Sequence, residues 1–320
     1  MTFPRNVRIL ENMSTLPYTD LNSHLRARFG CRVHKIPIDA GLTCPNRDGS
    51  RGVGGCIYCN ALGSGTGAAS RATVAEQIHE AQPFLRTRYR AEKFIAYFQS
   101  FSNTYAPVET LRALWSDALA GEDIVGLAIG TRPDCVGENI LDLLEEFGRS
   151  TWLSLELGLQ SIHDRTLALI NRGHTAAEFM DAVHRARARG IDTCVHVILG
   201  LPGETREDML ETALALASLD IQGIKLHLQY VVRGTPLHRL EERGEYRCLE
   251  MEEYAEILCT FIACLPRQVV IHRLTGDPHR DELVAPRWAL DKGAVLRRIG
   301  ETFRTRGLRQ GSLCPEELTP

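Results

Sequence analysis

From about residue 94, hydrophobic positions along the chain alternate between two rhythms. Short apolar or β-branched runs are followed by longer stretches in which Leu, Ala and Ile recur at helical spacing. Each pair of segments predicts one strand followed by one helix. The predicted strands are residues 94–99, 124–131, 151–160, 193–201 and 224–232, with an earlier run at 35–43 and a further candidate at 269–276.

Helices placed between strands impose parallel pairing and right-handed crossovers. Gly121, Gly148 and Gly190 fall where the helical stretches should end. The pattern therefore leaves an α/β fold with either an open doubly wound sheet or a full or partial barrel. In both, ligands bind at the carboxyl ends of the strands, so residues just after each run become candidates.

The chain from about residue 233 onward does not continue this alternation clearly. An arginine-rich helix is expected at 286–307. We therefore expect a core over residues 1–232 and a C-terminal extension over 233–320 that packs on it. No fixed-period repeat or low-complexity segment interrupts the chain.

Composition narrows the class of protein. The 320 residues are 44% hydrophobic and 24% charged, which is typical of a soluble globular protein with a sizeable core. A net charge of -3 gives no overall attraction to nucleic acid or to anionic membranes. Arg5, Arg8 and Glu11 break the N-terminal apolar residues, and no apolar run is long enough to span a bilayer. We expect a cytoplasmic protein without membrane contact, in which clustered cysteines serve metal or redox chemistry.

Three cysteines cluster in the sequence GLTCPNRDGSRGVGGCIYCN. Cys44, Cys56 and Cys59 lie in one glycine-rich loop that lets the backbone wrap closely around a bound object. Thiolates select zinc, copper(I) or iron-sulfur clusters. A structural zinc needs four ligands, for which Cys31 or His34 is the nearest supplement, whereas a 4Fe-4S cluster on three cysteines leaves one iron open. Unliganded core thiols are the third alternative.

With this loop in view, the chain resembles the radical S-adenosylmethionine (radical SAM) superfamily. It is most similar to the YhcC-type family, which is related to the radical SAM domain of the Elongator catalytic subunit. Eleven residues separate Cys44 from Cys56, where the commonest superfamily motif has three, but the longer loop is similar to that of these two groups. The resemblance extends over YFQSFSNTYAPVE, GTRPD, ELGLQS, NRGHT, ILGLPGET, KLHLQYVVRGTPL and HRLTGD.

The resemblance implies a partial (β/α)6 TIM-like barrel of the radical SAM type with a C-terminal extension. It also implies that S-adenosylmethionine binds the open iron of a 4Fe-4S cluster held by Cys44, Cys56 and Cys59. Reductive cleavage would then produce a 5′-deoxyadenosyl radical that takes a hydrogen atom from a substrate the sequence does not name. The implied electron donor is a flavodoxin or ferredoxin.

Several residues match positions that contact S-adenosylmethionine in similar enzymes. Tyr58 corresponds to the aromatic residue that lies against the adenine, and Arg172 resembles the arginine that grips the methionine carboxylate. Gln99 and Ser100 stand where the family often has a Gly-Gly-Glu turn, which is absent here. They are candidate contacts to the methionine amino group, and a plain strand-end turn is the alternative.

Further contacts are expected from later strands. Glu156 and Gln160 share one face of a predicted strand, so Glu156 either contacts the ribose or forms an internal salt bridge with Arg172. Ile198 and Gly200 resemble the motif that packs the adenine, with a Gly-Pro-Gly turn as the alternative.

The remaining features have simpler interpretations. Asp134 is a candidate helix N-cap, Cys135 is either a buried thiol or a substrate neighbour, and Cys194, Cys259 and Cys264 are assigned to the core. The GSGTG segment at 63–67 lacks the context of a dinucleotide loop and is interpreted as flexible. The basic stretch fits either RNA phosphates, as in the tRNA-modifying Elongator relatives, or a solvated helix face. It comprises Arg297, Arg298, Arg304, Arg306 and Arg309.

Two rival functions follow from the same residues. A zinc-stabilised RNA-binding protein would use the three cysteines with Cys31 or His34, and an iron-sulfur redox sensor would hold the cluster without turnover. One zinc per chain would indicate the first, whereas about four irons and four sulfides would indicate a cluster.

Overall fold

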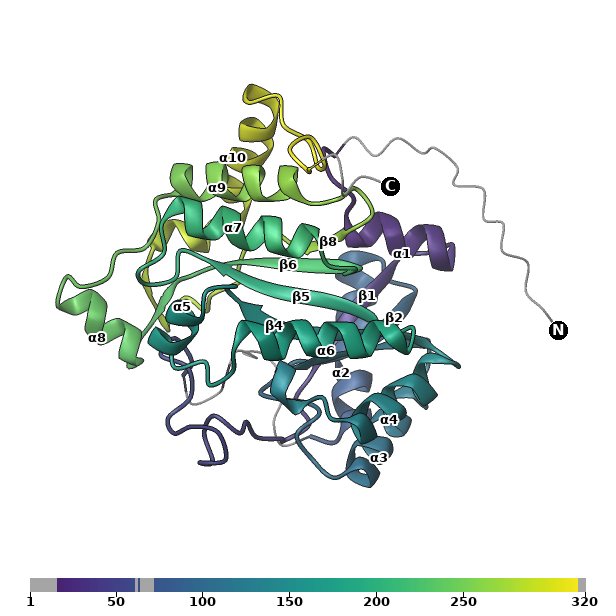
Figure 1. Cartoon of the computed structure of the whole chain (residues 1–320). Helices are drawn as coiled ribbons and strands as arrows, with labels where there is room; N and C mark the ends of the chain where they lie inside the picture. The colour runs from purple at the N-terminus through teal and green to yellow at the C-terminus, as the bar shows by residue number, and fades with distance from the viewer. Residues whose placement is uncertain (1–15, 61–62, 64–71, 316–320) are drawn as a thin grey trace.

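The computed structural model describes residues 16–60, 63 and 72–315. Seven parallel strands form one curled sheet, in the order β1-β2-β3-β4-β5-β6-β8 (Figure 1). This arrangement confirms the predicted α/β half-barrel. The strands are β1 (Val33–Ile38), β2 (Lys93–Phe98), β3 (Ile124–Thr131), β4 (Trp152–Gln160), β5 (Asp192–Leu199), β6 (Gly223–Leu228) and β8 (Val270–Arg273).

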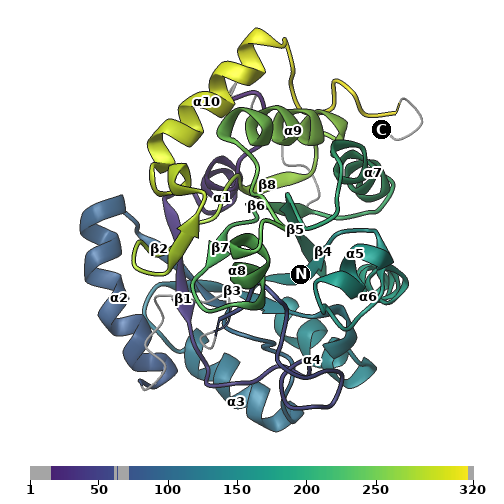
Figure 2. The same cartoon turned by 90° about the vertical axis from the view of Figure 1, so that its left-hand side faces the viewer.

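Helices cover the convex side of the sheet, as the end-on view shows (Figure 2). The outer helices are α2 (Val74–Tyr89), α3 (Val108–Leu119), α4 (Glu138–Gly148), α6 (Ala176–Ala188), α7 (Arg206–Ala217), α9 (Met251–Cys264) and α10 (Lys292–Thr305). Right-handed crossovers place most of them between two neighbouring strands, whereas α10 follows the last strand and packs on α9. Shorter helices are α1 (Leu21–Phe29), α5 (Asp164–Leu169) and α8 (Pro236–Glu242). No helix in the described ranges combines the length and apolar character needed to cross a bilayer.

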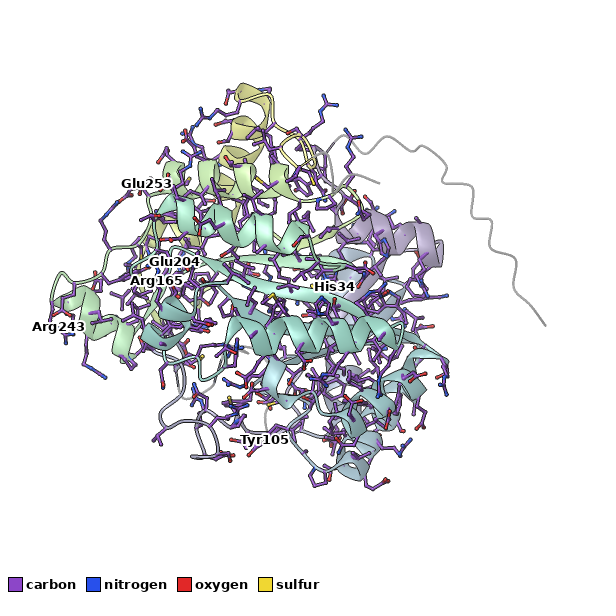
Figure 3. The ribbon with its side chains drawn as sticks, in the orientation of Figure 1. His34, Tyr105, Arg165, Glu204, Arg243 and Glu253 are labelled. Carbon is purple, nitrogen blue, oxygen red and sulfur yellow. The ribbon has the colours of Figure 1, made fainter. Side chains whose placement is uncertain are left out.

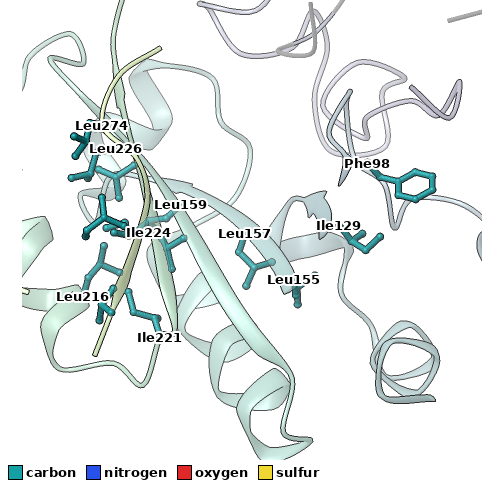
Figure 4. Close-up of a cluster of buried hydrophobic side chains, with 14 of the residues drawn as sticks. Phe98, Ile129, Leu155, Leu157, Leu159, Leu216, Ile221, Ile224, Leu226 and Leu274 are labelled. Atoms are coloured by element: carbon teal, nitrogen blue, oxygen red, sulfur yellow. The ribbon is translucent and has the colours of Figure 1, made fainter. Parts of the chain in front are cut away.

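Strand β4 shows how the sequence pattern separates the core from the concave face. Leu155, Leu157 and Leu159 are fully buried and join the large apolar cluster beneath the helices (Figure 4). Side chains alternate between the two faces of a strand, so Glu156 and Gln160 point to the concave side. Both line the cavity there. Burying each leucine stabilises the fold by roughly 1.5–3 kcal/mol, which fixes the register of β4 and thereby the positions of its polar residues.

One end of the half-barrel is closed by α1. The Ile271 amide of β8 donates a hydrogen bond to the Thr19 carbonyl at 2.8 Å, which ties the segment before α1 to the edge of the sheet. A small apolar cluster, including Leu25, Val33 and Trp152, fills this end of the barrel. These apolar side chains narrow the concave face at the amino ends of the strands, where residues of α1 also line the cavity.

Two sequence predictions need correction. The run at 224–232 is not one strand, because β6 ends at Leu228 and β7 (Val231–Val232) pairs antiparallel with β9 (Leu283–Ala285) instead. The seventh strand of the sheet, β8, falls within the candidate run at 269–276, as predicted, and lies in the segment expected to be an extension. The last helix begins at Lys292 rather than 286, after a short 3-10 turn, because the Asp291 side chain accepts the Ala294 amide as its cap.

Candidate active site

The cysteine loop leaves β1 and folds by local turns. The carbonyl of Cys44 accepts a hydrogen bond from the Arg47 amide at 2.9 Å, and the carbonyl of Cys56 accepts one from the Cys59 amide at 3.0 Å. All three cysteines line the same cavity at the concave face of the sheet. The loop therefore brings three cysteines, which are separated in sequence by up to 15 positions, to the lining of one cavity.

Asn46 and Asn171 fasten this loop to the end of α5. The Asn46 amide nitrogen donates to the Asn171 carbonyl at 2.5 Å and approaches Cys56 Sγ at 3.7 Å. In return, Asn171 donates to the Gly55 carbonyl at 2.7 Å. Gly52 is needed here, since a Cβ at this position would lie only 2.3 Å from Asn46 Oδ1.

Arg172 connects the cysteine loop to β4. One guanidinium nitrogen lies 3.7 Å from Cys56 Sγ, and another donates to the Gly158 carbonyl at 2.7 Å. Burial opposes its charge, but Tyr58, Cys56 and Cys44 together raise the pKa of Arg172. Its Nε is shielded from solvent and has no hydrogen-bond partner. Arg172 thus offers an unused donor beside the sulfur atoms.

The sulfur atoms suit a thiolate-bound centre. The neighbouring Cys59 thiol, with help from Arg172, lowers the pKa of Cys56 well below its usual value. Cys56 in turn, together with burial, raises the pKa of Cys59 well above its usual value. The lowered pKa and the nearby guanidinium favour a thiolate ligand at Cys56. The loop glycines and the orphaned Arg172 Nε also leave room and hydrogen-bonding capacity for a bound group. The chain therefore fits a cluster with three protein ligands.

The proposed fourth zinc ligands do not join the three cysteines. Cys31 packs at the apolar end of the barrel beside α1, and the His34 ring stacks on Tyr89 with centroids 4.5 Å apart. Cys31 precedes β1 and His34 is its second residue, whereas Cys44 follows the strand, whose six residues span roughly 20 Å. Figure 3 shows His34 well away from Tyr105, whose hydroxyl contacts Ser50 of the cysteine loop at 2.7 Å.

The expected S-adenosylmethionine contacts fall into two groups. Tyr58, Gln99, Gln160 and Ile198 all line the cavity together with the cysteines, as do Glu156 and Arg172. Ser100 and Gly200 do not line it. The Ser100 hydroxyl is buried without a hydrogen-bond partner, behind the strand-end turn.

Gly200 instead forms part of a turn beneath the C-terminal segment. Its φ of +86° is a left-handed conformation that favours glycine, and a Cβ would lie 3.0 Å from the side chain of Leu249. The Gly200 carbonyl accepts a hydrogen bond from the Tyr246 hydroxyl at 2.8 Å. These contacts show why the position requires glycine without any ligand.

Glu156 lies at the centre of a buried charge cluster. Its two oxygens accept Lys35 at 2.5 Å, His196 at 2.8 Å and Lys225. Burial alone would favour the neutral acid, but Lys225 and Lys35 hold the pKa of Glu156 well below its usual value. The expected salt bridge with Arg172 does not form, because Arg172 is engaged at Cys56 and Gly158.

The predicted N-cap role of Asp134 in the GTRPD motif is also wrong. Asp134 does not cap α4, whose N-cap is Gly137. It forms an ion pair with Arg132 at 2.9 Å instead, and Arg132 in turn donates to the Arg172 carbonyl at 2.6 Å. The motif therefore supports the Arg172 segment rather than starting a helix.

The other cysteines are buried or partly buried. Burial raises the pKa of Cys135 to about 12, which matches an ordinary buried thiol. Cys259 and Cys264 lie in α9 within the core, as predicted. Cys194 is buried as well, but its sulfur lies 3.3 Å from His272 Nδ1 on the concave side. GSGTG lies outside the described residues except for Gly63.

The cavity that unites these groups has a volume of about 840 Å³. A smaller hollow of about 320 Å³ lies beside Trp152 and Asp192 at the other end of the strands, away from the cysteines. Sequence reasoning missed part of the larger cavity's wall. Period-two polar positions in KIPI, CVHVI and IKLHL were the available signal for Lys35, His196, Lys225 and His227.

Comparisons with known proteins agree over most of the chain. A model of the radical SAM superfamily matches residues 44–216, and a model of the radical SAM C-terminal domain matches residues 221–305. The uncharacterized protein YtqA of Bacillus subtilis is 42% identical over 295 residues, which are 92% of this chain and 92% of that protein. Protein YhcC of Escherichia coli is 36% identical over 299 residues, 92% of this chain and 95% of that protein.

Two more distant similarities concern other proteins. A tRNA uridine(34) acetyltransferase of Methanocaldococcus jannaschii is 29% identical over 156 residues, 48% of this chain but 28% of that protein. Among solved structures, the archaeal Elp3 of Methanocaldococcus infernus superposes with a TM-score of 0.68 at 18% identity. That match covers 87% of this chain and 64% of the other, and it supports the half-barrel fold.

Proposed function

The chain belongs to the radical SAM superfamily and is a radical SAM enzyme, and on that premise we propose that Cys44, Cys56 and Cys59 hold a 4Fe-4S cluster whose open iron binds S-adenosylmethionine. When bound, this pair supplies reductive cleavage of the sulfonium and a 5′-deoxyadenosyl radical that abstracts hydrogen from substrate. The observation that carries the proposal is the convergence of the three cysteines on one cavity beside the buried Arg172.

The chain's own residues orient and shield this centre. Arg172 has a buried Nε free to donate to the methionine carboxylate, which suits a guanidinium. Tyr58 and Ile198 pack in one apolar cluster and form a surface for the adenine. Gln99 and Gln160 offer polar contacts on the same wall. The apolar cluster beside α1 narrows the cavity at the amino ends of the strands and limits the access of water from that side.

Metal content of two cysteine variants tests the cluster. Cys56→Ala should lose most of the roughly four irons and four sulfides expected after anaerobic reconstitution, because it removes one of three ligands. Cys31→Ala is the matched control, since Cys31 packs beside α1, and it should keep the full content. Full iron in Cys56→Ala, or zinc lost on removing Cys31, would contradict the proposal.

The proposal extends to the protein's surroundings and organisation. A flavodoxin or ferredoxin supplies the electron, which suits a cytoplasmic enzyme. Residues 1–232 form the radical SAM core and residues 233–320 the extension. The extension touches the cysteine loop through the Leu237 amide, which donates to the Ile57 carbonyl at 3.0 Å.

The candidate substrate of the proposed enzyme is RNA. The similarity to a protein named for tRNA uridine-34 supports it. The arginines of the α10 region give weaker support for RNA binding, because two of them are already paired with carboxylates. Arg298 pairs with Glu252 at 3.0 Å and Arg306 with Glu256 at 3.1 Å.

Loss of the gene should change the profile of modified tRNA nucleosides, measured by mass spectrometry. Restoring the wild-type gene should reverse the change, whereas restoring a Cys56→Ala gene should not. An unchanged profile with altered small metabolites would exclude RNA in favour of a metabolite substrate.

A further inference from the structure

The cavity contains a second polar layer below the cysteines. Side chains from five strands point into it: Lys35 from β1, Tyr97 from β2, Glu156 from β4, His196 from β5 and Lys225 from β6. We call these five residues the lumen layer. They lie between the apolar end at α1 and the carboxyl ends of the strands. Lys225 precedes the last residue of β6 by three positions, or roughly 10 Å.

Positive charge is in excess in this layer. One carboxylate, Glu156, faces two ammonium groups, and both lysines also lie over the ring of Tyr97, at 5.1 Å for Lys35 and 3.9 Å for Lys225. The whole cavity wall carries eight Lys or Arg residues against four Asp or Glu residues. Buried charge is costly unless it is balanced, so the cavity favours an incoming anion.

The use of lysine here is selective. The chain has 33 arginines and only four lysines, yet Lys35, Lys225 and Lys292 all line this one cavity. An ammonium is a compact point charge that fits a crowded layer and binds oxyanions in any orientation. Lys225 is 4% exposed, and its burial lowers its pKa to about 7, with Lys35 adding to the effect and Glu156 opposing it. A bound anion would place a balancing negative charge beside this buried ammonium group.

An unpartnered ring nitrogen faces the same space. His227 lies two residues beyond Lys225 on β6, and its Nε2 is shielded from solvent with no hydrogen-bond partner. The ring lies 5.3 Å from that of His196, between centroids. Arg273 of β8 pairs in register with Lys225. The wall above Lys225 therefore presents nitrogen atoms from His196, His227 and Arg273, and the Asp277 carboxylate lies 3.5 Å from the guanidinium of Arg273.

A metal cation is a poorer occupant. Glu156, Cys194 and His272 place ligand atoms within 4.8 Å of one another. However, both oxygens of Glu156 already accept ammonium groups, from Lys35 and Lys225. A cation at this point would have to lie beside two positive charges, which Coulomb repulsion opposes.

We propose that Lys225 and His227, backed by Lys35, bind an oxyanion group of the substrate, either a phosphate or a carboxylate. This inference rests on the proposed function, in which this cavity receives the substrate. The anionic group lies at the lumen layer, and the remainder of the substrate extends toward the cysteine end. The strand length between them accommodates a substrate portion of roughly 10 Å.

Anion binding to the full-length, anaerobically purified protein tests this site. Inorganic phosphate and succinate are titrated separately against chloride at matched ionic strength, with the unfolding temperature and calorimetric heat as readouts. At least one of the two should bind saturably, and the one that does identifies the group. If neither exceeds chloride, the inference is overturned.

Variants locate the binding. The charge-neutral double variant Lys225→Met/Glu156→Gln should weaken the anion at least tenfold, whereas Lys93→Met, which alters the one lysine outside the cavity, should not. His227→Phe keeps a ring and removes Nε2, so it provides a second test if the double variant folds poorly. Unchanged affinity in His227→Phe and in a folded double variant would overturn the assignment.

The assay uses neither S-adenosylmethionine nor reductant. Saturable binding that depends on Lys225, without 5′-deoxyadenosine formation in a separate reduced assay, would leave the anion site standing and remove the proposed function. Formation of 5′-deoxyadenosine without saturable anion binding would leave the proposed function standing and remove the anion site.

Discussion

At the scale of single residues, Arg172 connects the cysteine loop, β4 and the GTRPD motif. It approaches Cys56 Sγ and the Gly158 carbonyl, and its own carbonyl accepts Arg132. Two roles are therefore open to its side chain: support of the cysteine thiolate, and capture of a carboxylate through the unpartnered Nε. The two roles predict different losses in a variant.

Arg172→Met should weaken S-adenosylmethionine binding by about 10–100-fold, because a charged hydrogen bond contributes about 1.5–3 kcal/mol. The measurement is equilibrium dialysis with reconstituted protein, alongside iron analysis. Arg165→Met is the control, since Arg165 is exposed and pairs with Asp208 at the surface. Affinity equal to wild type would contradict capture, and iron loss with unchanged affinity per cluster would assign Arg172 to the thiolate alone.

Residue-level roles were only partly readable from the sequence. The three cysteines could be identified because their spacing and the glycines are local. The partners of Glu156 could not, since Lys35 and Lys225 are 121 and 69 positions away along the chain. Strand order and register bring these residues together, and neither can be predicted from a short segment of sequence.

At the scale of elements, most strands and helices follow from periodicity. The predicted strand at 124–131 coincides with β3, and that at 151–160 differs from β4 by one residue. Helix starts are equally local: Thr73, Thr175 and Thr205 each form a capping box with the acid three positions later.

Strand bounds cannot be predicted from the local sequence where pairing with a distant strand determines them. Residues 224–232 read as one apolar run, but the Gln229 side chain donates to the Tyr230 carbonyl at 2.7 Å where β6 ends. Val231 and Val232 then pair with β9, some 50 positions later. A hydrophobic run predicts that its residues are buried but does not determine which sheet they join.

At the scale of the whole molecule, the extension is part of the sheet. Strand β8 pairs parallel with β6, and α9 buries Tyr254, Leu258 and Phe261 in the same apolar cluster as β4 and β5. The segment before α1 also bonds to β8. The segment before α1 and the C-terminal extension thus share one core, even though family models divide the chain near residue 220.

A chain ending at Val232 should therefore not fold independently. It would lose β8 and α9, which leaves the edge of β6 unpaired and exposes apolar side chains such as Leu216 and Leu226. We expect aggregation, or a protein without a cooperative thermal transition, measured by size-exclusion chromatography and calorimetry.

The control cuts the chain without removing any of it. A protease site inserted after the exposed Gly244, beyond the end of α8, should allow cleavage while both pieces stay associated, because the β6–β8 pairing and the α7–α9 packing remain. Stable association would show that the interface, rather than chain continuity, holds the half-barrel together. A monomeric 1–232 fragment with the unfolding temperature of the full chain would instead make the extension dispensable for the fold, and its role would then be limited to covering the cysteine loop.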